Sequence, residues 1–286
     1  MKLASRFAFG SPCLRSDTPL SDDQIRAVAP SIYADAKHVS RSERYTYLPT
    51  SVILTALKGQ GFQPFMVAQT RVRDSERREH TKHMLRMRHA SQINDTEAAE
   101  VILLNSHDGS SAYQMVSGMM RFVCKNGLVC GDSIADFRVP HKGNIVDAVI
   151  AGAFEVVEGF DLVREKRDAM RAVTLNDAEQ AIFARAALSL KYEPDPLRPA
   201  PITEAQLLHT RRFADAGRDA WTVLNRIQEN VIQGGIPSRT AAGRNSRTRP
   251  VQGIDQGVKL NRALWMLGEE MARLKTAGAV EALAVA

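Results

Sequence analysis

The sequence is poor in cysteine and in aromatic residues, and each shortage excludes a class of protein. Only 3 of the 286 residues are cysteine. A small, odd number of cysteines argues against a disulfide framework and favours a reducing compartment, so we expect a cytoplasmic protein. Aromatic residues make up 6% of the chain. This leaves few side chains for stacking on nucleic-acid bases and favours contact with a nucleic-acid backbone instead.

Long apolar runs are absent as well. No stretch of 18 residues lacks a charged side chain, so we expect no membrane-spanning helix and no membrane partner. Arg6 lies where the apolar core of a signal peptide would have to be, and we therefore expect no cleaved leader.

Sequence motifs for nucleotide and metal chemistry are also missing. The chain contains no GxxxxGK[ST], GxGxxG or HExxH, so we expect no bound cofactor and no ATP-driven activity. His80 and His83 form an HxxH pair. On a strand, however, their side chains would lie on opposite faces and would not share a metal ion.

The proportions of hydrophobic and charged residues are those of an ordinary globular protein, and positive charge is concentrated in two segments. Hydrophobic residues make up 44%, charged residues make up 24%, and the net charge is +6. Residues 71–88 hold seven Arg or Lys against three acids, and residues 238–250 hold four Arg and no acid. A basic balance favours polyanionic partners, so these two segments are the candidate binding sites.

Alternating polarity predicts two paired strands around the first basic segment. Met66 and Ala68 begin an apolar face in one strand, and Leu85 and Met87 continue it in the next, while cations occupy the alternate positions. A hairpin of these strands would present five cations to solvent: Arg71, Arg73, Lys82, Arg86 and Arg88. Phosphate groups would relieve the repulsion between these like charges. The alternative is a plain solvated face whose long side chains cover apolar neighbours.

Further strands are predicted at residues 99–105 and 112–118. Asn126-Gly127 between two apolar runs predicts a two-residue type I′ turn, because both of its central positions need positive φ. Four more cations near this turn could extend the basic track: Arg121, Lys125, Arg138 and Lys142.

The rest of the chain is predicted to be mostly helical. Asn144 can cap a long amphipathic helix that begins at Ile145. Further helices are expected near residues 176–191, 203–216, 219–233 and 255–275. Residues 236–253 have few apolar side chains and predict a mobile loop, in which four arginines could fold onto a phosphate backbone: Arg239, Arg244, Arg247 and Arg249. A linker without a ligand is the alternative.

Together these elements predict an α+β fold, in which an antiparallel β-sheet with hairpins packs on a long helix and a mostly helical C-terminal half follows. We expect three regions in the chain. Residues 1–48 form an arm with a short helix that Ser21 can cap, and residues 49–175 form an α+β core with a basic sheet face, beginning with a helix that Thr50 can cap. Residues 176–286 form a helical region that contains the arginine-rich loop.

A family resemblance rests on four strings in order: LLNSHDGSSAYQMVSGMMRFVCKNGLVCGD, LNRIQENVIQGG, GRNSRTRPV and LNRALWML. They resemble a family of phage- and plasmid-borne proteins catalogued as the domain of unknown function 932, over roughly residues 40–268. In element order that family is similar to the hairpin-and-helix core of the Rad52-type single-strand annealing proteins. The resemblance implies an oligomeric ring that carries single-stranded DNA in a basic groove, although the large helical half departs from that core.

We therefore expect an ATP-independent protein of a mobile element that binds and anneals single-stranded DNA as a homo-oligomer and is not an enzyme. Two alternatives stay open. A metal-dependent nuclease would use His107 and Asp108 with Asp132 or Asp136, although NSHDGSS is also typical of a tight turn. A non-enzymatic inhibitor of a host factor would have no DNA ligand at all.

Overall fold

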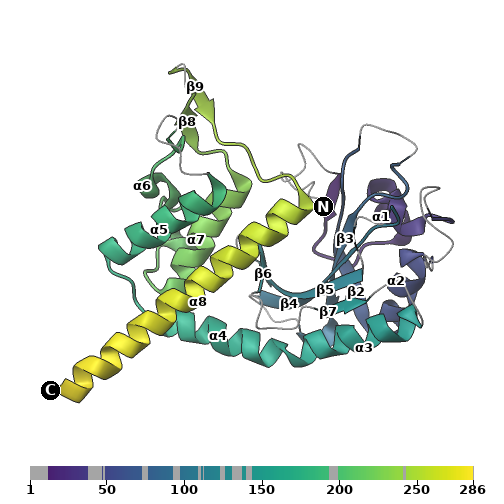
Figure 1. Cartoon of the computed structure of the whole chain (residues 1–286), viewed down its shortest axis with the longest axis horizontal. Coiled ribbons are helices and arrows are strands. Elements are labelled where there is room, and N and C mark those ends of the chain that lie inside the picture. The colour runs from purple at the N-terminus through teal and green to yellow at the C-terminus, as the bar shows by residue number, and fades with distance from the viewer. Residues whose placement is uncertain are drawn as a thin grey trace. The chain divides into compact units, whose positions relative to one another are not determined.

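The computed structural model describes most of the chain and contains two units. The described residues are 12–37, 47, 49–72, 77–92, 97–108, 111, 113–122, 126–130, 137–139, 144–192, 199–240 and 243–285. Unit 1 comprises Met1–Phe122, Asp132–Phe160 and Gln252–Asp255, and unit 2 comprises Val123–Gly131, Asp161–Val251 and Gln256–Ala286. Figure 1 labels the helices and strands of both units.

The larger β-sheet of the described chain has the strand order β1-β2-β3-β4-β5-β6, and β7 also pairs with β5. Its strands are β1 (Cys13–Arg15), β2 (Phe62–Gln69), β3 (His83–His89), β4 (Glu97–Asn105), β5 (Tyr113–Arg121), β6 (Asn126–Val129) and β7 (Phe137–Val139). Neighbours from β1 to β5 pair antiparallel, as does β7 with β5. Helices make up most of the remaining described chain, and the predicted α+β class is confirmed.

The alternation predicted within each strand of the first basic segment holds, but the predicted common face of the two strands is wrong, and so is its exposure. Met66 and Ala68 lie opposite Arg86 and Met84, so the cations of β3 share a face with the residues of β2 that are predicted to be apolar core, and Leu85 lies opposite Val67. Arg86 lies opposite Met66 of β2 and Ile102 of β4, so Arg86 and Arg88 share one face, away from Leu85. The residues of β3 up to Arg88 and all residues of β4 are nevertheless buried, on both faces. Alternation reports which side chains share a face of a strand, and it does not report whether that face is covered.

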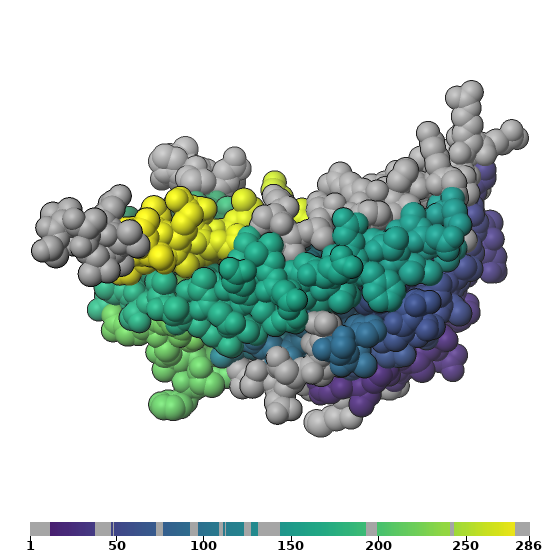
Figure 2. Space-filling model, turned by 90° about the horizontal axis from the view of Figure 1, so that it is seen from below, coloured from purple at the N-terminus to yellow at the C-terminus, as the bar shows by residue number. Residues whose placement is uncertain are grey.

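The described part of unit 1 contains five helical segments: α1 (Asp22–Val28), α2 (Thr50–Gly59), α3 (Ile145–Glu158) and the 3₁₀ helices η1 (Pro30–Tyr33) and η2 (Ala90–Gln92). The predicted caps at Ser21 and Asn144 are confirmed, because their side chains accept hydrogen bonds from the backbone N–H groups of Gln24 and Asp147. The α2 helix packs on β2, and α3 packs on β5. The outward side of α3 faces solvent in Figure 2.

The predicted cap at Thr50 is wrong. Thr50 is the first residue of α2, and Pro49 occupies the N-cap position without a capping side-chain bond. The Thr50 hydroxyl instead forms hydrogen bonds with His83 and Asn105, which are buried side chains of the sheet. Long-range partners therefore decide the role of this hydroxyl.

The predicted Asn126-Gly127 turn is also wrong. Both residues belong to β6, and the glycines with positive φ in the described chain are Gly61, Gly234, Gly235 and Gly243. Since a type I′ turn requires positive φ at both central positions, the connection from β5 lies before Asn126. The residues just before this dipeptide, 123–125, lie outside the described part of the chain.

Unit 2 is mostly helical. Its helices are α4 (Phe160–Ala172), α5 (Asp177–Lys191), α6 (Glu204–Leu207), the 3₁₀ helix η3 (Phe213–Asp215), α7 (Ala220–Gln233) and α8 (Ile254–Val285), of which α4 and α8 begin with residues of unit 1. The helices predicted near residues 176–191, 219–233 and 255–275 are confirmed, while the one near 203–216 shrinks to α6 and η3. Trp221 and Trp265 pack edge to face in the core, with ring centroids 5.9 Å apart.

The segment predicted to be a mobile loop contains two strands, and this prediction is therefore wrong. β8 (Pro237–Arg239) and β9 (Asn245–Arg247) pair antiparallel as a separate two-stranded sheet. Within unit 2, Figure 1 shows this hairpin projecting from the group of α5, α6 and α7.

Among the helices of the described chain, none has both the length and the hydropathy that a membrane span requires.

Candidate nucleic-acid interface

Arg86 and Arg88, predicted to bind nucleic acid, are internal ion-pair partners. Nε of Arg86 lies 2.6 Å from Oε2 of Glu100, and Nε of Arg88 lies 3.0 Å from Oε1. The side chains of Arg86, Arg88 and Glu100 are 5%, 3% and 1% exposed. Charges this deeply buried persist in folded proteins when they are paired. The prediction of an exposed basic sheet face is therefore wrong at these two residues.

A third arginine, Arg15 of β1, completes this ionic cluster. Its guanidinium group contacts the sulfur atoms of Met66 and Met120 at 3.2 and 3.3 Å. Burial by itself would raise the pKa of Glu100, but the positive charges of the three arginines hold that pKa below its usual value. The cluster thus keeps one ionised carboxylate among three guanidinium groups inside unit 1, where it is part of the core and closed to a polyanion.

The other predicted sheet cations do not gather with these arginines on one surface of the described structure. Lys82 binds Asp255 at 2.8 Å. Arg121 lies directly opposite Glu97 in the register of β4 and β5, and Arg71 is exposed just after β2. The side chains of four others lie outside the described part of the chain: Arg73, Lys125, Arg138 and Lys142.

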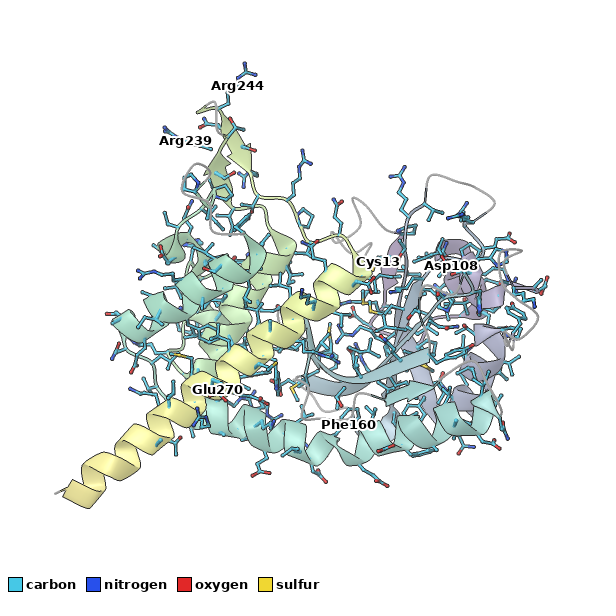
Figure 3. The ribbon with its side chains drawn as sticks, in the orientation of Figure 1. Cys13, Asp108, Phe160, Arg239, Arg244 and Glu270 are labelled. Carbon is cyan, nitrogen blue, oxygen red and sulfur yellow. The ribbon has the colours of Figure 1, made fainter. Side chains whose placement is uncertain are left out.

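The two residues of the nuclease alternative have different surroundings. His107 is 0% exposed, whereas Asp108, labelled in Figure 3, is partly exposed. A fully buried imidazole is not placed to activate water against an external phosphodiester. Asp132 and Asp136 lie outside the described residues, within which no three His, Cys, Asp or Glu side chains gather as metal ligands would.

His107 belongs to a buried hydrogen-bond network in unit 1. The hydroxyl oxygen of Thr50 lies 2.9 Å from both Nε2 of His83 and Nδ2 of Asn105, and 3.3 Å from Nε2 of His107. Nδ1 of His83 lies 2.9 Å from the hydroxyl oxygen of Ser31. Burial lowers the pKa of His83 to about 4, so its ring is neutral near pH 7. This network is a polar part of the core, and its members are too scattered in the sequence to be recognised there.

The second basic segment is a hairpin with a fixed root. Residues 236–249, called the arginine hairpin from here on, begin at Ile236, whose N–H donates to the Thr248 hydroxyl at 3.1 Å and whose carbonyl accepts from the Thr248 N–H at 2.9 Å. Ile236 and Val251 are 7% and 8% exposed. Gly234 has a φ of +60°, and a Cβ atom there would lie 2.7 Å from the carbonyl oxygen of Thr248. The root therefore requires glycine and is held in the core of unit 2.

The tip of the arginine hairpin is closed by a short loop. The N–H of Thr240 donates to the carbonyl of Arg244 at 2.9 Å, and the N–H of Gly243 donates to the carbonyl of Thr240 at 2.8 Å. Gly243 has a φ of +72°, a left-handed conformation that glycine adopts without steric cost. Apart from Pro237, the side chains of the two strands are polar on both faces. The sequence therefore shows no alternation of polarity that would predict these strands.

Its four arginines are all exposed: Arg239, Arg244, Arg247 and Arg249. No aspartate or glutamate occurs between Gly234 and Ile254 in the sequence. In the part of the chain that the structure describes, none of the four arginines forms an ion pair. In this respect they differ from Arg86 and Arg88 of the sheet, which are paired with Glu100. Figure 3 shows Arg239 and Arg244 directed into solvent at the far end of the hairpin.

Strand register places two of these arginines on one face of the ribbon. Arg239 is opposite Asn245, and Pro237 is opposite Arg247, so Arg239 and Arg247 are diagonal neighbours on the same face. Diagonal neighbours of an antiparallel pair lie about 7–8 Å apart. The guanidinium group of Arg247 donates to the carbonyl of Gly235 at 2.7 Å, which directs it toward the root.

Comparison with known proteins gives relatives without a stated activity. A family model described as "Domain of unknown function (DUF932)" matches residues 37–265. The chain is similar to two proteins of Escherichia coli (strain K12), UPF0380 protein YafZ and UPF0380 protein YfjQ. Each is 52% identical over 270 residues, which cover 94% of this chain and 97% of the relative. No solved structure matches.

Proposed function

Since this chain belongs to the family of the domain of unknown function DUF932, whose description names no activity, we propose a function from its own surface. We propose that it is a non-catalytic, ATP-independent protein that binds the phosphate backbone of a nucleic acid through the arginine hairpin. One observation carries this proposal: an anchored ribbon exposes four arginines that no carboxylate neutralises in the described structure.

The chemistry of arginine suits a phosphate ligand. The planar guanidinium group presents parallel N–H donors that match two phosphate oxygens. Arg239 and Arg247 lie on one face of the ribbon, where like charges repel each other until an anion lies between them. Because the ribbon is already folded, binding orders fewer backbone torsions than it would in a disordered loop.

Counterion release supplies the driving force. A nucleic acid carries condensed cations along its phosphates, and each arginine that neutralises a phosphate releases some of them. The resulting affinity does not depend on base sequence and falls as salt concentration rises. This mode fits a chain that has few aromatic residues.

We further propose that the ligand is single-stranded DNA and that a homo-oligomer of this protein, encoded by a mobile element, holds and anneals it in the cytoplasm. Several hairpins on one assembly would bind one strand with higher avidity than a single hairpin. Annealing is measured as the rate at which two labelled complementary oligonucleotides pair without ATP. If the protein does not change this rate, annealing activity is contradicted. Binding of the phosphate backbone is tested separately, by the arginine substitutions below.

Replacing all four hairpin arginines by alanine is expected to weaken binding to a single-stranded oligonucleotide and to flatten its salt dependence. If each arginine neutralises one phosphate, the slope of log affinity against log salt loses about 2.8 in magnitude, since each contact contributes about 0.7. Fluorescence anisotropy at a series of salt concentrations measures both quantities.

A matched control removes the same charge from other parts of unit 2. It replaces four arginines whose side chains are 35–71% exposed and whose partners are acidic: Arg164, Arg171, Arg185 and Arg273. This control should bind nearly as the unchanged protein does. Equal losses in the two quadruple variants would mean that net charge alone matters. A protein without affinity for DNA at physiological salt would contradict the proposal outright.

A further inference from the structure

Phe213 is the most exposed large apolar side chain in the described part of the chain. It is 96% exposed, and the next is Leu274 at 59%. Exposed apolar side chains are common on proteins, but a phenylalanine that is almost completely in water loses nearly all the stabilisation that its burial would give. Folding therefore does not explain the side chain of Phe213.

The backbone that carries Phe213 is held in place by charged groups of unit 2. The guanidinium group of Arg212 binds the carboxylates of both Asp215 and Glu229 at 2.5 Å. Arg226, on α7, donates to the carbonyl oxygens of Asp215 and Gly217 at 2.7 and 2.6 Å. Asp215, Arg226 and Glu229 are 1%, 7% and 3% exposed. The ring of Phe213 thus stands on a fixed 3₁₀ turn.

The same turn is tied to the root of the arginine hairpin. Arg211 donates to the carbonyl of Gly234 at 2.6 Å, and Arg247 donates to the adjacent carbonyl of Gly235 at 2.7 Å. A second tie runs from α6, where the side-chain amide of Gln206 donates to the carbonyl of Pro237 at 2.8 Å. The exposed ring and the hairpin cations therefore belong to one hydrogen-bonded part of unit 2.

We infer that Phe213 is a stacking platform for a base of a single-stranded nucleic acid whose phosphates lie on the arginine hairpin. This inference rests on the proposed function and names its ligand class. Proteins that bind single strands without reading their sequence combine a cationic track with aromatic side chains on which bases stack. In a duplex the bases are already stacked and paired, so an external ring selects for single strands.

The surroundings of Phe213 favour a base over a protein partner. A protein contact site places an aromatic anchor among other exposed apolar side chains. Between residues 199 and 219, however, Phe213 is the one large apolar side chain that is exposed. Its neighbour Arg211 is a cation that donates to Asn230, Gln233 and Gly234, whereas Arg212 and Arg218 are paired with carboxylates. A lone exposed aromatic ring beside Arg211, on a turn tied to the root of the arginine hairpin, suits a ligand that has both phosphates and flat apolar bases.

The experiment compares a single-stranded oligonucleotide with an abasic one of the same length and charge. We expect the unchanged protein to prefer the oligonucleotide that has bases by about tenfold or more, the size of one to two stacking contacts. Phe213→Ala should lose most of this preference, while its affinity for the abasic strand and its Tm stay unchanged. Phe213→Trp should keep the preference, and the fluorescence that it adds should be quenched by the strand with bases.

The matched control is Ile182→Ala, which removes an apolar side chain that is 57% exposed on α5 and should leave the preference intact. A preference that survives Phe213→Ala overturns the stacking role, and so does unchanged DNA binding accompanied by loss of self-association. Binding of both strands with equal affinity by the unchanged protein also overturns stacking but leaves the arginine hairpin in place. Binding of neither strand removes the proposed function itself.

Discussion

Replacing Glu100 by glutamine is expected to destabilise the protein by about 3–5 kcal/mol, the usual cost of removing one partner from a buried ion pair. Glutamine has nearly the same shape as glutamate, so the change removes charge without opening a cavity. The guanidinium groups of Arg86 and Arg88 then remain buried without the carboxylate that now lies 2.6 and 3.0 Å from their Nε atoms. Urea denaturation at pH 7 measures the loss.

The control is the same substitution at an exposed ion pair. Glu270 binds Arg273 on the surface, where the two side chains are 57% and 65% exposed. Exposed pairs contribute little to stability because water screens them, so Glu270→Gln should leave the urea midpoint nearly unchanged. Similar small effects at both positions would show that the sheet arginines are hydrated in the folded protein, which would contradict the expectation.

The DNA affinity of the Glu100→Gln variant is a second measurement that tests the position of the sheet arginines. If Arg86 and Arg88 bound phosphates, removing their carboxylate would free two cations and strengthen DNA binding. Since both arginines lie inside the core, we expect Glu100→Gln to bind DNA with unchanged affinity at temperatures where it is folded. A clear gain in affinity would restore the basic sheet face that the structure excludes.

Acidification from pH 7 to pH 5 is expected to lower the free energy of unfolding by about 2 kcal/mol through His83 alone. Burial lowers the pKa of His83 from its usual 6.5 to about 4 in the folded protein. Between these two pKa values the imidazole of His83 is protonated in the unfolded chain but stays neutral in the folded protein. Stability is therefore complete above pH 6.5 and is lost as the pH falls toward 4.

This window separates His83 from the carboxylates. Buried or paired acids such as Glu100 have lowered pKa values, so their contribution is lost only as the pH falls below their usual value of 4.5. In the His83→Gln variant the dependence between pH 7 and pH 5 should shrink by about one proton. An NMR titration of the ring nitrogens gives an independent check, because a folded protein in which His83 titrates near pH 6.5 would refute the expectation.

The elements that depend on neighbouring residues are the ones that the sequence predicts well. Ser21 and Asn144 cap their helices because the cap and its partner are three residues apart. The face shared by Arg86 and Arg88 follows from counting residues by twos along a strand. Glu100 within the apolar run AEVILLN is a signal that could have predicted a buried partner for these arginines, since a charge inside a central strand must be paired.

The sequence predicts the candidate site only in part. The reason differs between the arginine hairpin and Phe213. The arginines of the hairpin are recognisable by their number and by the absence of acids around them, but the ribbon that orders them has no apolar alternation. Phe213 is visible in the sequence as an aromatic residue among arginines, yet its exposure depends on the bonds of Arg212 and Arg226 to residues far along the chain. Thr50 likewise has its partners 33 and 55 residues away.

Local order along the chain was sufficient to establish the fold class, most helices and which side chains alternate within a strand, because helical and extended periodicity act over a few residues. It did not establish which faces of β2 and β3 combine, since that depends on the register between the strands. Whether a charged side chain meets water, a carboxylate or a phosphate depends on which distant segments cover it, and that was settled by tertiary packing. Arg86 and Arg239 are the same amino acid in similarly basic stretches. One is enclosed with Glu100 in the core and the other stands in solvent, so only the second is available to a polyanion.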